Sequence, residues 1–464
     1  MFAALSVVAL ATTVVSIPPP RTTGEVQINL ASGRLAASVC VENWPTGVGR
    51  SVSLHGGLNL AHVRDQTGKV LNFSGWYGGA VDGEGRVYDF DPPAAGPVCF
   101  DYVGSAPMFP EYDAVGDFKG LIAADGKSLR ASEQAVWLPT PFDPKAKKRF
   151  QNTTYRLHVV CDDCTLLYMN GAAPVQGHEA TFESATPQRP LLFAGKGLID
   201  VGPGVNVVNF KLSPEGRAGW TTFFHSVRGF YANYLGRGFD DTPTILRFDS
   251  LDRGLKPKRR WGFATWPTLA FGNGDLDAMG QTLSRDDEEG RGNSAYVAHE
   301  TAHYYFNSLT ANGPYRWLLV ESAAEFMSWK ALASMKGQGA LEVRLTKTVA
   351  DFNAFKTAPL PLNAIVESEQ IGSGYRYVYG PLLLESLERS IGDTRMRQFM
   401  RGLLNARELS SWADVARIAR AAGVSSAEWD EWTRRCVDGA PKACISALAT
   451  PPSAPSQTTE KPPA

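Results

Sequence analysis

The chain has 464 residues, which is too long for one compact core and predicts two or three domains. Hydrophobic residues make up 44% and charged residues 20% of the chain, as in ordinary folded proteins. The formal net charge of -1 argues against a nucleic-acid-binding protein and against a polybasic segment that docks on membranes.

The N-terminus begins with an uncharged apolar run over residues 3–16, and the sequence IPPPR follows it at once. The run is too short to span a bilayer comfortably and is typical of a secretory signal, which predicts a signal peptide over 1–16. A buried strand or an interfacial segment is the alternative, because no lysine or arginine precedes the run. No later run reaches transmembrane length, so we expect an exported chain, periplasmic or secreted, with no membrane span.

Residues 25–212 contain short stretches of alternating polarity, such as 27–30 and 155–160, which glycine, proline and aspartate turns separate. This alternation is typical of strands that bury one face. It predicts an N-terminal β domain that is similar to a β-sandwich.

The periodicity then becomes helical, with aromatic and aliphatic residues of 219–235 recurring at helical spacing. A strand-like run at 261–271 interrupts the helical pattern, and an acidic loop at 285–293 leads back into it. We therefore expect a mostly helical second domain over 216–448, and an α+β chain as a whole. The proline-rich end, 449–464, predicts a disordered tail.

The six cysteines are an even number, which is typical of an oxidising compartment. Cys161 and Cys164 form a lone CxxC, and no second CxxC completes a four-sulfur zinc site. A local disulfide is therefore the prediction here, rather than redox catalysis. Cys436 and Cys444 are close enough in sequence to tie down the C-terminal segment, whereas the full pairing stays open.

The motif with the clearest chemistry is His299-Glu300-Thr301-Ala302-His303. Two histidines four residues apart lie on one face of a helix, so their imidazoles can bind one cation. Glu300 lies beside the first histidine, where it can accept a proton from a water that zinc activates. Such HExxH runs also occur by chance, but the apolar neighbours predict a buried helix, in which unpartnered histidines would be costly. We predict one Zn2+ per chain.

A catalytic zinc needs a third protein ligand. Glu321 is the candidate, because the four apolar residues before it carry it into the interior. Glu325 lies one helical turn further on the same face and can accept the outward N–H of a ligand histidine. For each glutamate, the alternative is a place on the solvent-exposed face of an amphipathic helix.

These residues resemble the M1 family of zinc aminopeptidases, which has a thermolysin-like catalytic domain and a glutamate as the third zinc ligand. The family separates HExxH from this glutamate by eighteen residues, whereas 304–320 supply seventeen here. The context at 317–321 is similar to that of the family, and 136–140 and 169–171 resemble parts of its N-terminal β domain. The resemblance covers roughly residues 130–400. It implies a β domain followed by a thermolysin-like zinc peptidase domain.

A further stretch, Tyr377-Val378-Tyr379-Gly380, is similar to the Tyr-x-x-Gly at the start of a family helix. The match implies that Tyr377 donates a hydrogen bond to the tetrahedral oxyanion, an interaction typically worth roughly 10²–10³ in rate. Tyr375 and Tyr379 are neighbouring alternatives, and a packing aromatic is another.

The family also has a Gly-x-Met-Glu-Asn strand before the zinc helix, whose glutamate binds the free amine of the substrate. The corresponding stretch here, 269–275, contains Phe271, Gly272 and Asn273 but no Met-Glu-Asn. We expect these three residues to form the substrate strand, and the run over 261–271 could act as an edge strand that pairs with an extended peptide.

The predicted function is an exported zinc metallopeptidase that hydrolyses peptide bonds in the manner of an M1 aminopeptidase. Asp275 or Asp277 could supply the missing negative charge, or could only cap a turn. The first alternative is therefore an endopeptidase, or an amidase or esterase, without free-amine specificity. The second is an inactive binding scaffold. The expected partner is a peptide substrate, no nucleic acid is expected, and the oligomeric state stays open.

Overall fold

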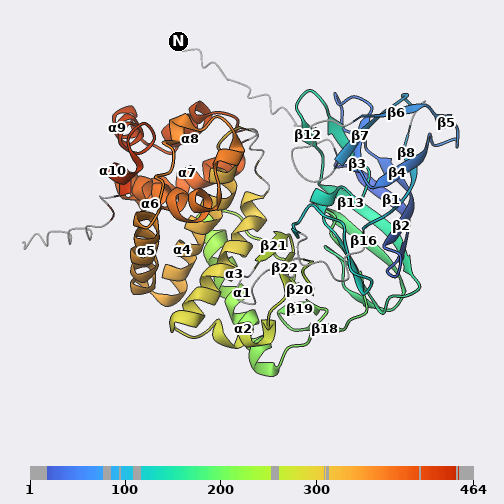
Figure 1. Cartoon of the computed structure of the whole chain (residues 1–464), viewed down its shortest axis with the longest axis horizontal. Coiled ribbons are helices and arrows are strands. Elements are labelled where there is room, and N and C mark those ends of the chain that lie inside the picture. Colours follow the sequence, from blue (N-terminus) through green and yellow to red (C-terminus); the bar gives the residue numbers. More distant parts are fainter. Residues whose placement is uncertain are drawn as a thin grey trace, which may run out of the picture. The chain divides into compact units, whose positions relative to one another are not determined.

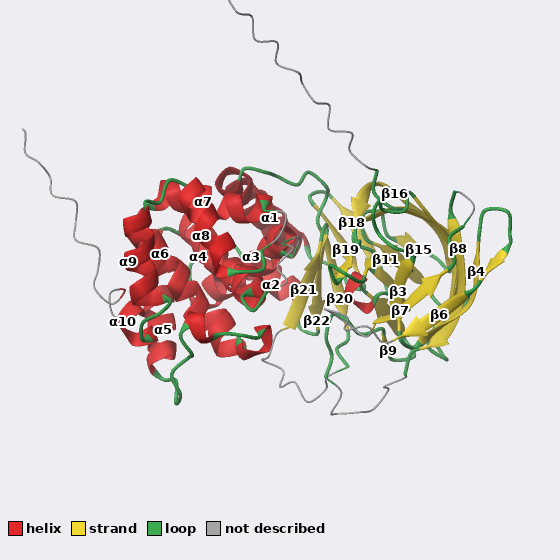
Figure 2. Cartoon of the chain, turned by 90° about the horizontal axis from the view of Figure 1, so that it is seen from above, coloured by secondary structure: helices red, strands yellow, loops and turns green. Residues whose placement is uncertain are grey.

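The computed structural model describes most of the chain, namely residues 18–76, 85–93, 96–107, 116–251, 261–307, 309, 313–406, 409–445 and 448. The predicted signal peptide and the predicted tail, 449–464, lie outside the described residues. The chain divides into two compact units, Met1–Ile199 with Asp249–Lys258, and Asp200–Phe248 with Arg259–Ala464. Strands make up the first unit, and helices dominate the second (Figure 1 and Figure 2). The α+β fold class is thus confirmed.

The first unit contains a seven-stranded sheet of order β16-β13-β1-β2-β8-β4-β5. Its strands are β1 Arg21–Asn29, β2 Arg34–Glu42, β4 Leu58–Arg64, β5 Val70–Leu71, β8 Val98–Ser105, β13 Thr153–Cys161 and β16 Glu179–Gln188. The first strand pairs with β13 in parallel and with β2 in antiparallel register. The residues of β13 alternate between buried and more exposed along the strand, as the sequence pattern requires.

Two further sheets of the first unit have the orders β15-β14-β17-β10-β9 and β12-β11-β3-β7-β6. Their strands are β3 Ser51–His55, β6 Phe73–Trp76, β7 Gly85–Phe90, β9 Ala123–Ala124, β10 Ser128–Ala131, β11 Thr140–Asp143, β12 Lys148–Arg149, β14 Leu166–Met169, β15 Val175–Gln176 and β17 Leu192–Gly195. Trp137 is fully buried in the core of this unit, and its indole N–H donates to the carbonyl of Pro190 at 3.2 Å. A large aromatic side chain thus has its one polar atom paired.

Three disulfides join the six cysteines. Cys161 bonds to Cys164 and Cys436 to Cys444, as the sequence spacing predicts. The third joins Cys40 of β2 to Cys99 of β8, which are direct partners in the register of the two strands. Disulfides of this number are typical of proteins in an oxidising compartment.

The second unit contains a five-stranded sheet of order β18-β19-β20-β22-β21. Its strands are β18 Ile199–Gly202, β19 Val205–Val208, β20 Thr244–Phe248, β21 Trp261–Thr265 and β22 Thr268–Gly272. The strands β19, β20 and β22 run parallel, and β21 is antiparallel to β22 at the end of the sheet. The run expected as one strand over 261–271 is therefore a hairpin of two strands.

The helices of the second unit are α1 Pro214–Leu235, α2 Leu276–Thr282, α3 Glu288–Phe306, α4 Ala323–Lys336, α5 Gln338–Asn353, α6 Gly380–Ile391, α7 Asp393–Asn405, α8 Trp412–Ala421, α9 Ser426–Cys436 and α10 Pro441–Ile445. Two π-helical turns, η2 Leu318–Ser322 and η5 Tyr375–Tyr379, precede α4 and α6. Ser213 caps the start of α1, and Gly236 in a left-handed conformation ends it. In the described part of the chain, no helix combines the length and the apolar character that crossing a bilayer requires.

The helices α1 and α2 approach each other so closely that two glycines form the contact. A Cβ atom on Gly219 would lie 1.9 Å from the carbonyl oxygen of Gly280, which is backbone and cannot rotate away. The indole N–H of Trp220 in α1 donates to the carbonyl of Leu276 in α2 at 2.8 Å. The absence of a side chain at these positions thus sets the distance at which α2 packs.

We expect Gly219→Ala to lower the free energy of unfolding by about 1–3 kcal/mol, because the methyl group forces the two helices apart. Gly229→Ala on the same helix is the matched control, since a Cβ atom there meets nothing within 4 Å. That control should stabilise α1 by about 0.5–1 kcal/mol through helix propensity. Urea denaturation of both variants measures the difference, and equal midpoints would contradict the close contact.

Candidate metal centre

The two motif histidines lie on α3, which begins at a capped N-terminus. Asp287 accepts a hydrogen bond from the backbone N–H of Gly290 and so caps the first turn. Further along the helix His299, Glu300 and His303 are buried, with exposed fractions of 7%, 6% and 6%. Three buried polar side chains on one helix need hydrogen-bond or metal partners, since each would otherwise lose its hydration without compensation.

Three side-chain atoms converge beside α3. The Nε2 atoms of His299 and His303 are 3.1 Å apart. Glu321 on η2 brings Oε2 to 3.6 Å from Nε2 of the first histidine and to 3.5 Å from that of the second. The fold thus brings together the three residues that the sequence predicts as metal ligands, His299, His303 and Glu321.

The three atoms fit a zinc ion. Ligands at 2.0–2.1 Å from a tetrahedral zinc lie about 3.3 Å from one another, which is close to the separations observed here. Two imidazoles and a carboxylate are also the ligand types that catalytic zinc sites use. The one other group with possible metal ligands among the described residues, Cys161, Asp163 and Cys164, has both sulfurs joined in a disulfide.

Glu325 lies one turn after Glu321 and supports the first histidine. Its Oε2 lies 3.0 Å from Nδ1 of His299, the ring nitrogen that faces away from the other ligand atoms. Its Oε1 accepts from the indole N–H of Trp329 at 2.9 Å and from the guanidinium of Arg344 at 2.5 Å. A carboxylate in this place fixes the ring orientation of a ligand histidine.

The charges of these groups depend on one another. Burial would raise the pKa of Glu325, but Arg344 and His299 outweigh it and lower this pKa to about 2. Burial would likewise lower the pKa of His299, but the hydrogen bonds to Glu321 and Glu325 raise it to about 10. The two carboxylates thus favour the protonated form of this imidazole. A zinc ion must displace the proton on binding, because zinc binds neutral imidazole.

Tyr377 faces the same group from η5. Its hydroxyl donates to Oε2 of Glu321 at 2.9 Å, and its ring centroid lies 5.8 Å from that of His299. Burial raises the pKa of Tyr377, and Glu321 raises it further, so the phenol keeps its proton at neutral pH. Tyr377 as a whole residue is 40% exposed, in contrast to the buried histidines beside it.

The other two tyrosines of η5 lie in the core. Tyr379 is fully buried and stacks on Phe352 at a centroid distance of 5.6 Å. Tyr375 is 5% exposed and packs edge-on against Tyr379. Of the three tyrosines, Tyr377 is the one that contacts a predicted metal ligand.

A glycine and a serine fix the distance between the two π-helical turns. A Cβ atom on Gly380 would lie 2.1 Å from Oγ and 2.6 Å from Cβ of Ser322, the residue after Glu321. The close approach of η5 to η2 therefore needs a glycine here. The Tyr-x-x-Gly motif contains this glycine, but the motif does not predict its contact with Ser322, which lies on another element. The ion pair between Arg344 and Glu325 likewise joins two different helices and is not predicted by any spacing.

The predicted substrate strand requires a correction. Phe271 and Gly272 belong to β22, which pairs with β20 on one side and with β21 on the other, so its backbone has no side left for a peptide. The side chain of Phe271 is buried in the core, and Asn273 follows the strand in a left-handed turn with φ of 59°. The last strand of the sheet, among those described, is β21.

The two aspartates after β22 bind at the starts of two helices. Asp275 caps α2 by accepting from the backbone N–H groups of Asp277 and Ala278. Asp277 accepts from the backbone N–H and the hydroxyl of Ser213, the residue that caps α1, at 2.8 and 2.9 Å. Asp275 thus has the capping role that the sequence left as an alternative, and Asp277 connects α2 to the start of α1.

No protein-family model and no curated protein sequence matches this chain. Several solved structures do match it. Leukotriene A4 hydrolase from Saccharomyces cerevisiae has a TM-score of 0.65 and 13% identity, and the match covers 90% of this chain and 67% of that one. The M1 zinc metallopeptidase from Deinococcus radiodurans has a TM-score of 0.62 and 14% identity, and the match covers 89% of this chain and 92% of that one. A variant of the Deinococcus enzyme bound to a Tyr-Ser-Ala substrate has a TM-score of 0.61 and 15% identity, with 90% of this chain and 94% of that one covered.

Agreement over nine tenths of the chain at such low identity establishes a shared architecture. Its parts are the N-terminal β domain, the helical domain after it, and a buried His-His-Glu group on that second domain. The chain therefore has the fold of the M1 zinc metallopeptidases, with a group of side chains like the zinc site of that fold.

Proposed function

We propose that this protein is a zinc-dependent peptidase with one Zn2+ held by His299, His303 and Glu321. The observation that carries the proposal is the convergence of three donor atoms, 3.1 to 3.6 Å apart, on one buried point. When bound, zinc polarises a carbonyl and lowers the pKa of water to about 7. The likeness in fold to M1 zinc metallopeptidases supports the same chemistry.

Two further side chains complete the proposed catalytic group. Glu300 follows the first ligand and is buried on α3, and its negative charge contributes to the raised pKa of both His299 and Tyr377. It takes the proton from the attacking water and passes it to the leaving amine. Tyr377 donates its hydrogen bond to the oxygen that becomes negative when the peptide carbonyl is attacked.

The proposal places the peptide substrate beside the hairpin of β21 and β22, which lies against α3. Asn307 donates to the carbonyl of Ala264 at 3.3 Å, and Tyr304 donates to that of Pro267 at 3.2 Å. A peptide bound along this hairpin would lie beside the helix that carries the metal ligands.

A second candidate differs in specificity. The stretch 269–275 lacks Met-Glu-Asn, and its one carboxylate, Asp275, is engaged in capping α2. This observation favours a peptidase, amidase or esterase that does not require a free amine. Peptides with free and with acetylated N-termini separate the two candidates: a strong preference for the free amine supports an aminopeptidase, and equal cleavage supports the alternative.

The proposed location is outside the cytoplasm. Three disulfides and an apolar N-terminal run both suit an exported protein. Expression of the full chain in a bacterium, followed by N-terminal sequencing of the periplasmic fraction, tests the export and the cleavage near Ser16.

The purified protein should contain about one zinc per chain, because the ligand set matches a catalytic site. Removal of the metal by a chelator should abolish peptide turnover, and added zinc should restore it. Elemental analysis and a peptidase assay measure both. A zinc content near zero together with no peptide turnover would favour the binding scaffold, and turnover without zinc would refute the metal mechanism.

We expect Glu300→Gln to retain zinc but to lose about 10²–10⁴-fold in kcat, because the amide cannot accept the proton. Glu288→Gln is the matched control, since this exposed glutamate lies in the first turn of the same helix. Its activity should equal that of the unchanged protein. Peptidase turnover of Glu300→Gln at the normal rate would refute the mechanism.

Tyr377→Phe should lower kcat by roughly 10²–10³-fold with a small change in KM, because the lost hydrogen bond forms with the transition state. Tyr315→Phe serves as a control, because Tyr315 packs edge-on against Trp412, away from the predicted ligands. Steady-state kinetics on one peptide substrate distinguishes the variants. A KM effect alone would assign Tyr377 to substrate binding rather than to the oxyanion.

A further inference from the structure

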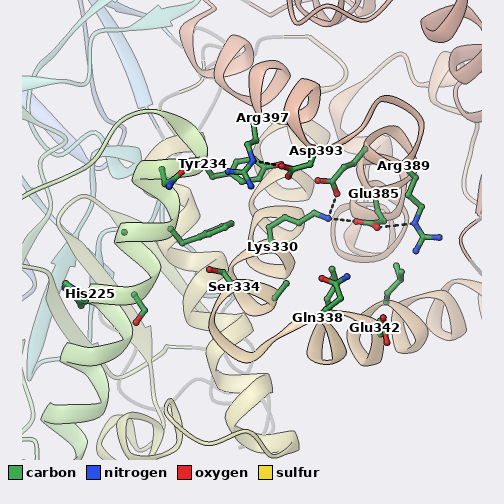
Figure 3. A pocket seen from close by; sticks show the side chains of 18 residues that line it. His225, Tyr234, Lys330, Ser334, Gln338, Glu342, Glu385, Arg389, Asp393 and Arg397 are labelled. Carbon is green, nitrogen blue, oxygen red and sulfur yellow. Dashed lines mark hydrogen bonds and ion pairs between the residues drawn. The ribbon is translucent and has the colours of Figure 1, made fainter. Parts of the chain in front are cut away.

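The second unit has a cavity of about 930 Å³ that none of the predicted metal ligands lines. Its walls come from α1, α4, α6 and α7 and from the first turns of α5 (Figure 3). His225 marks its α1 side, and Lys330, Glu385 and Arg397 mark the side formed by α4, α6 and α7. The cavity is therefore a separate feature of the helical unit.

A buried ion cluster forms one wall of this cavity. The ammonium group of Lys330 lies 2.9 Å from Oε2 of Glu385 and also contacts Oε2 of Glu388. Glu385 receives a further contact from Nε of Arg389 at 3.3 Å. The side chains of the two glutamates are only 7% and 11% exposed, so this wall is largely shielded from bulk water.

The charges of the lining favour a cation over an anion. Four carboxylates line the cavity: Glu342, Glu385, Glu388 and Asp393. Against them stand three permanently cationic side chains, Lys330, Arg389 and Arg397, and each is already paired with one of these carboxylates. The pairs engage Glu385, Glu388 and Asp393, so four carboxylates against three cations leave Glu342 in excess, and this one net negative charge favours a cation over an anion.

Glu388 is the most suitable of these carboxylates. Among the described residues, its ion pair is made through Oε2, which leaves Oε1 to a donor from the cavity. Burial raises the pKa of Glu388, and Glu385 and Asp393 contribute to the increase even though Lys330 opposes it. The carboxylate is thus stabilised by any further positive charge beside it.

The rest of the lining supplies an acceptor and an apolar surface. Tyr234 lines the cavity, and its hydroxyl is buried without a hydrogen-bond partner in the described structure; the guanidinium of Arg397 lies 4.7 Å from its ring centroid. A phenol oxygen can accept a hydrogen bond from an ammonium group. Phe230, Leu341 and Leu345 offer the apolar side chains along which methylene groups pack.

We propose that this cavity binds a linear aliphatic polyamine, with one ammonium group at Glu388 and the methylene chain against Phe230 and Leu341. Ammonium groups match the excess of carboxylates, and a methylene chain matches the apolar wall. A hydrated metal ion matches only the first of these, and the ammonium of Lys330 occupies the place between the two buried glutamates that such an ion would need.

Calorimetric titration of the full chain with spermidine tests the proposal. We expect saturable binding, which Glu388→Gln weakens at least tenfold because it removes the charge and keeps the shape. Ser334→Trp should abolish binding, because an indole at this exposed lining position fills the cavity. Glu431→Gln on α9, an exposed glutamate outside the cavity, is the control and should bind as the unchanged chain does.

Three results would overturn the proposal: no saturable heat, equal affinity of Ser334→Trp and the unchanged chain, or equal competition by magnesium at matched charge. Thermal unfolding of Ser334→Trp shows whether the variant is folded, so a loss of binding by a folded protein supports the cavity as the site. The assay needs no peptidase activity, so its outcome is independent of the proposed function.

Discussion

The structure of the helical unit depends on the burial of two imidazoles and two carboxylates at one contact between α3, η2 and α4. None of these groups would be stable there alone, because each loses its hydration in the interior. Glu321 lies within 3.6 Å of both histidines, and Glu325 connects one histidine to Arg344. The observed packing of these helices gives each of these groups a partner, and the same packing brings together the His-His-Glu group that is like a zinc site.

Two of the predicted site residues lie on π-helical turns. Glu321 lies on η2 and Tyr377 on η5, and each turn leads directly into a regular helix, α4 or α6. A π turn carries an extra residue, and such turns are frequent at functional sites. Gly380 then allows the two turns to approach, because Ser322 occupies the space of its missing side chain.

Local patterns in the sequence predict what depends on local geometry. The pairing of His299 with His303 follows from helical spacing, and the inward position of Glu321 follows from the apolar residues before it. The order of strands in a sheet is not local, which is why the sequence alone does not predict that Phe271 and Gly272 lie on β22, between β20 and β21. The contact of Arg344 with Glu325 and the cavity between the helices likewise depend on tertiary packing, and no spacing in the sequence predicts them.

The hydrogen bond between Tyr377 and Glu321 has a consequence for the approach of a substrate. The hydroxyl is held at 2.9 Å from the carboxylate before any carbonyl is near, so the entropy of orienting its ring is lost during folding rather than during the reaction. Under the proposed mechanism, a substrate oxygen would take over a hydrogen-bond donor that is already oriented. The carboxylate of Glu321 would then give up this donor as negative charge develops on the substrate oxygen.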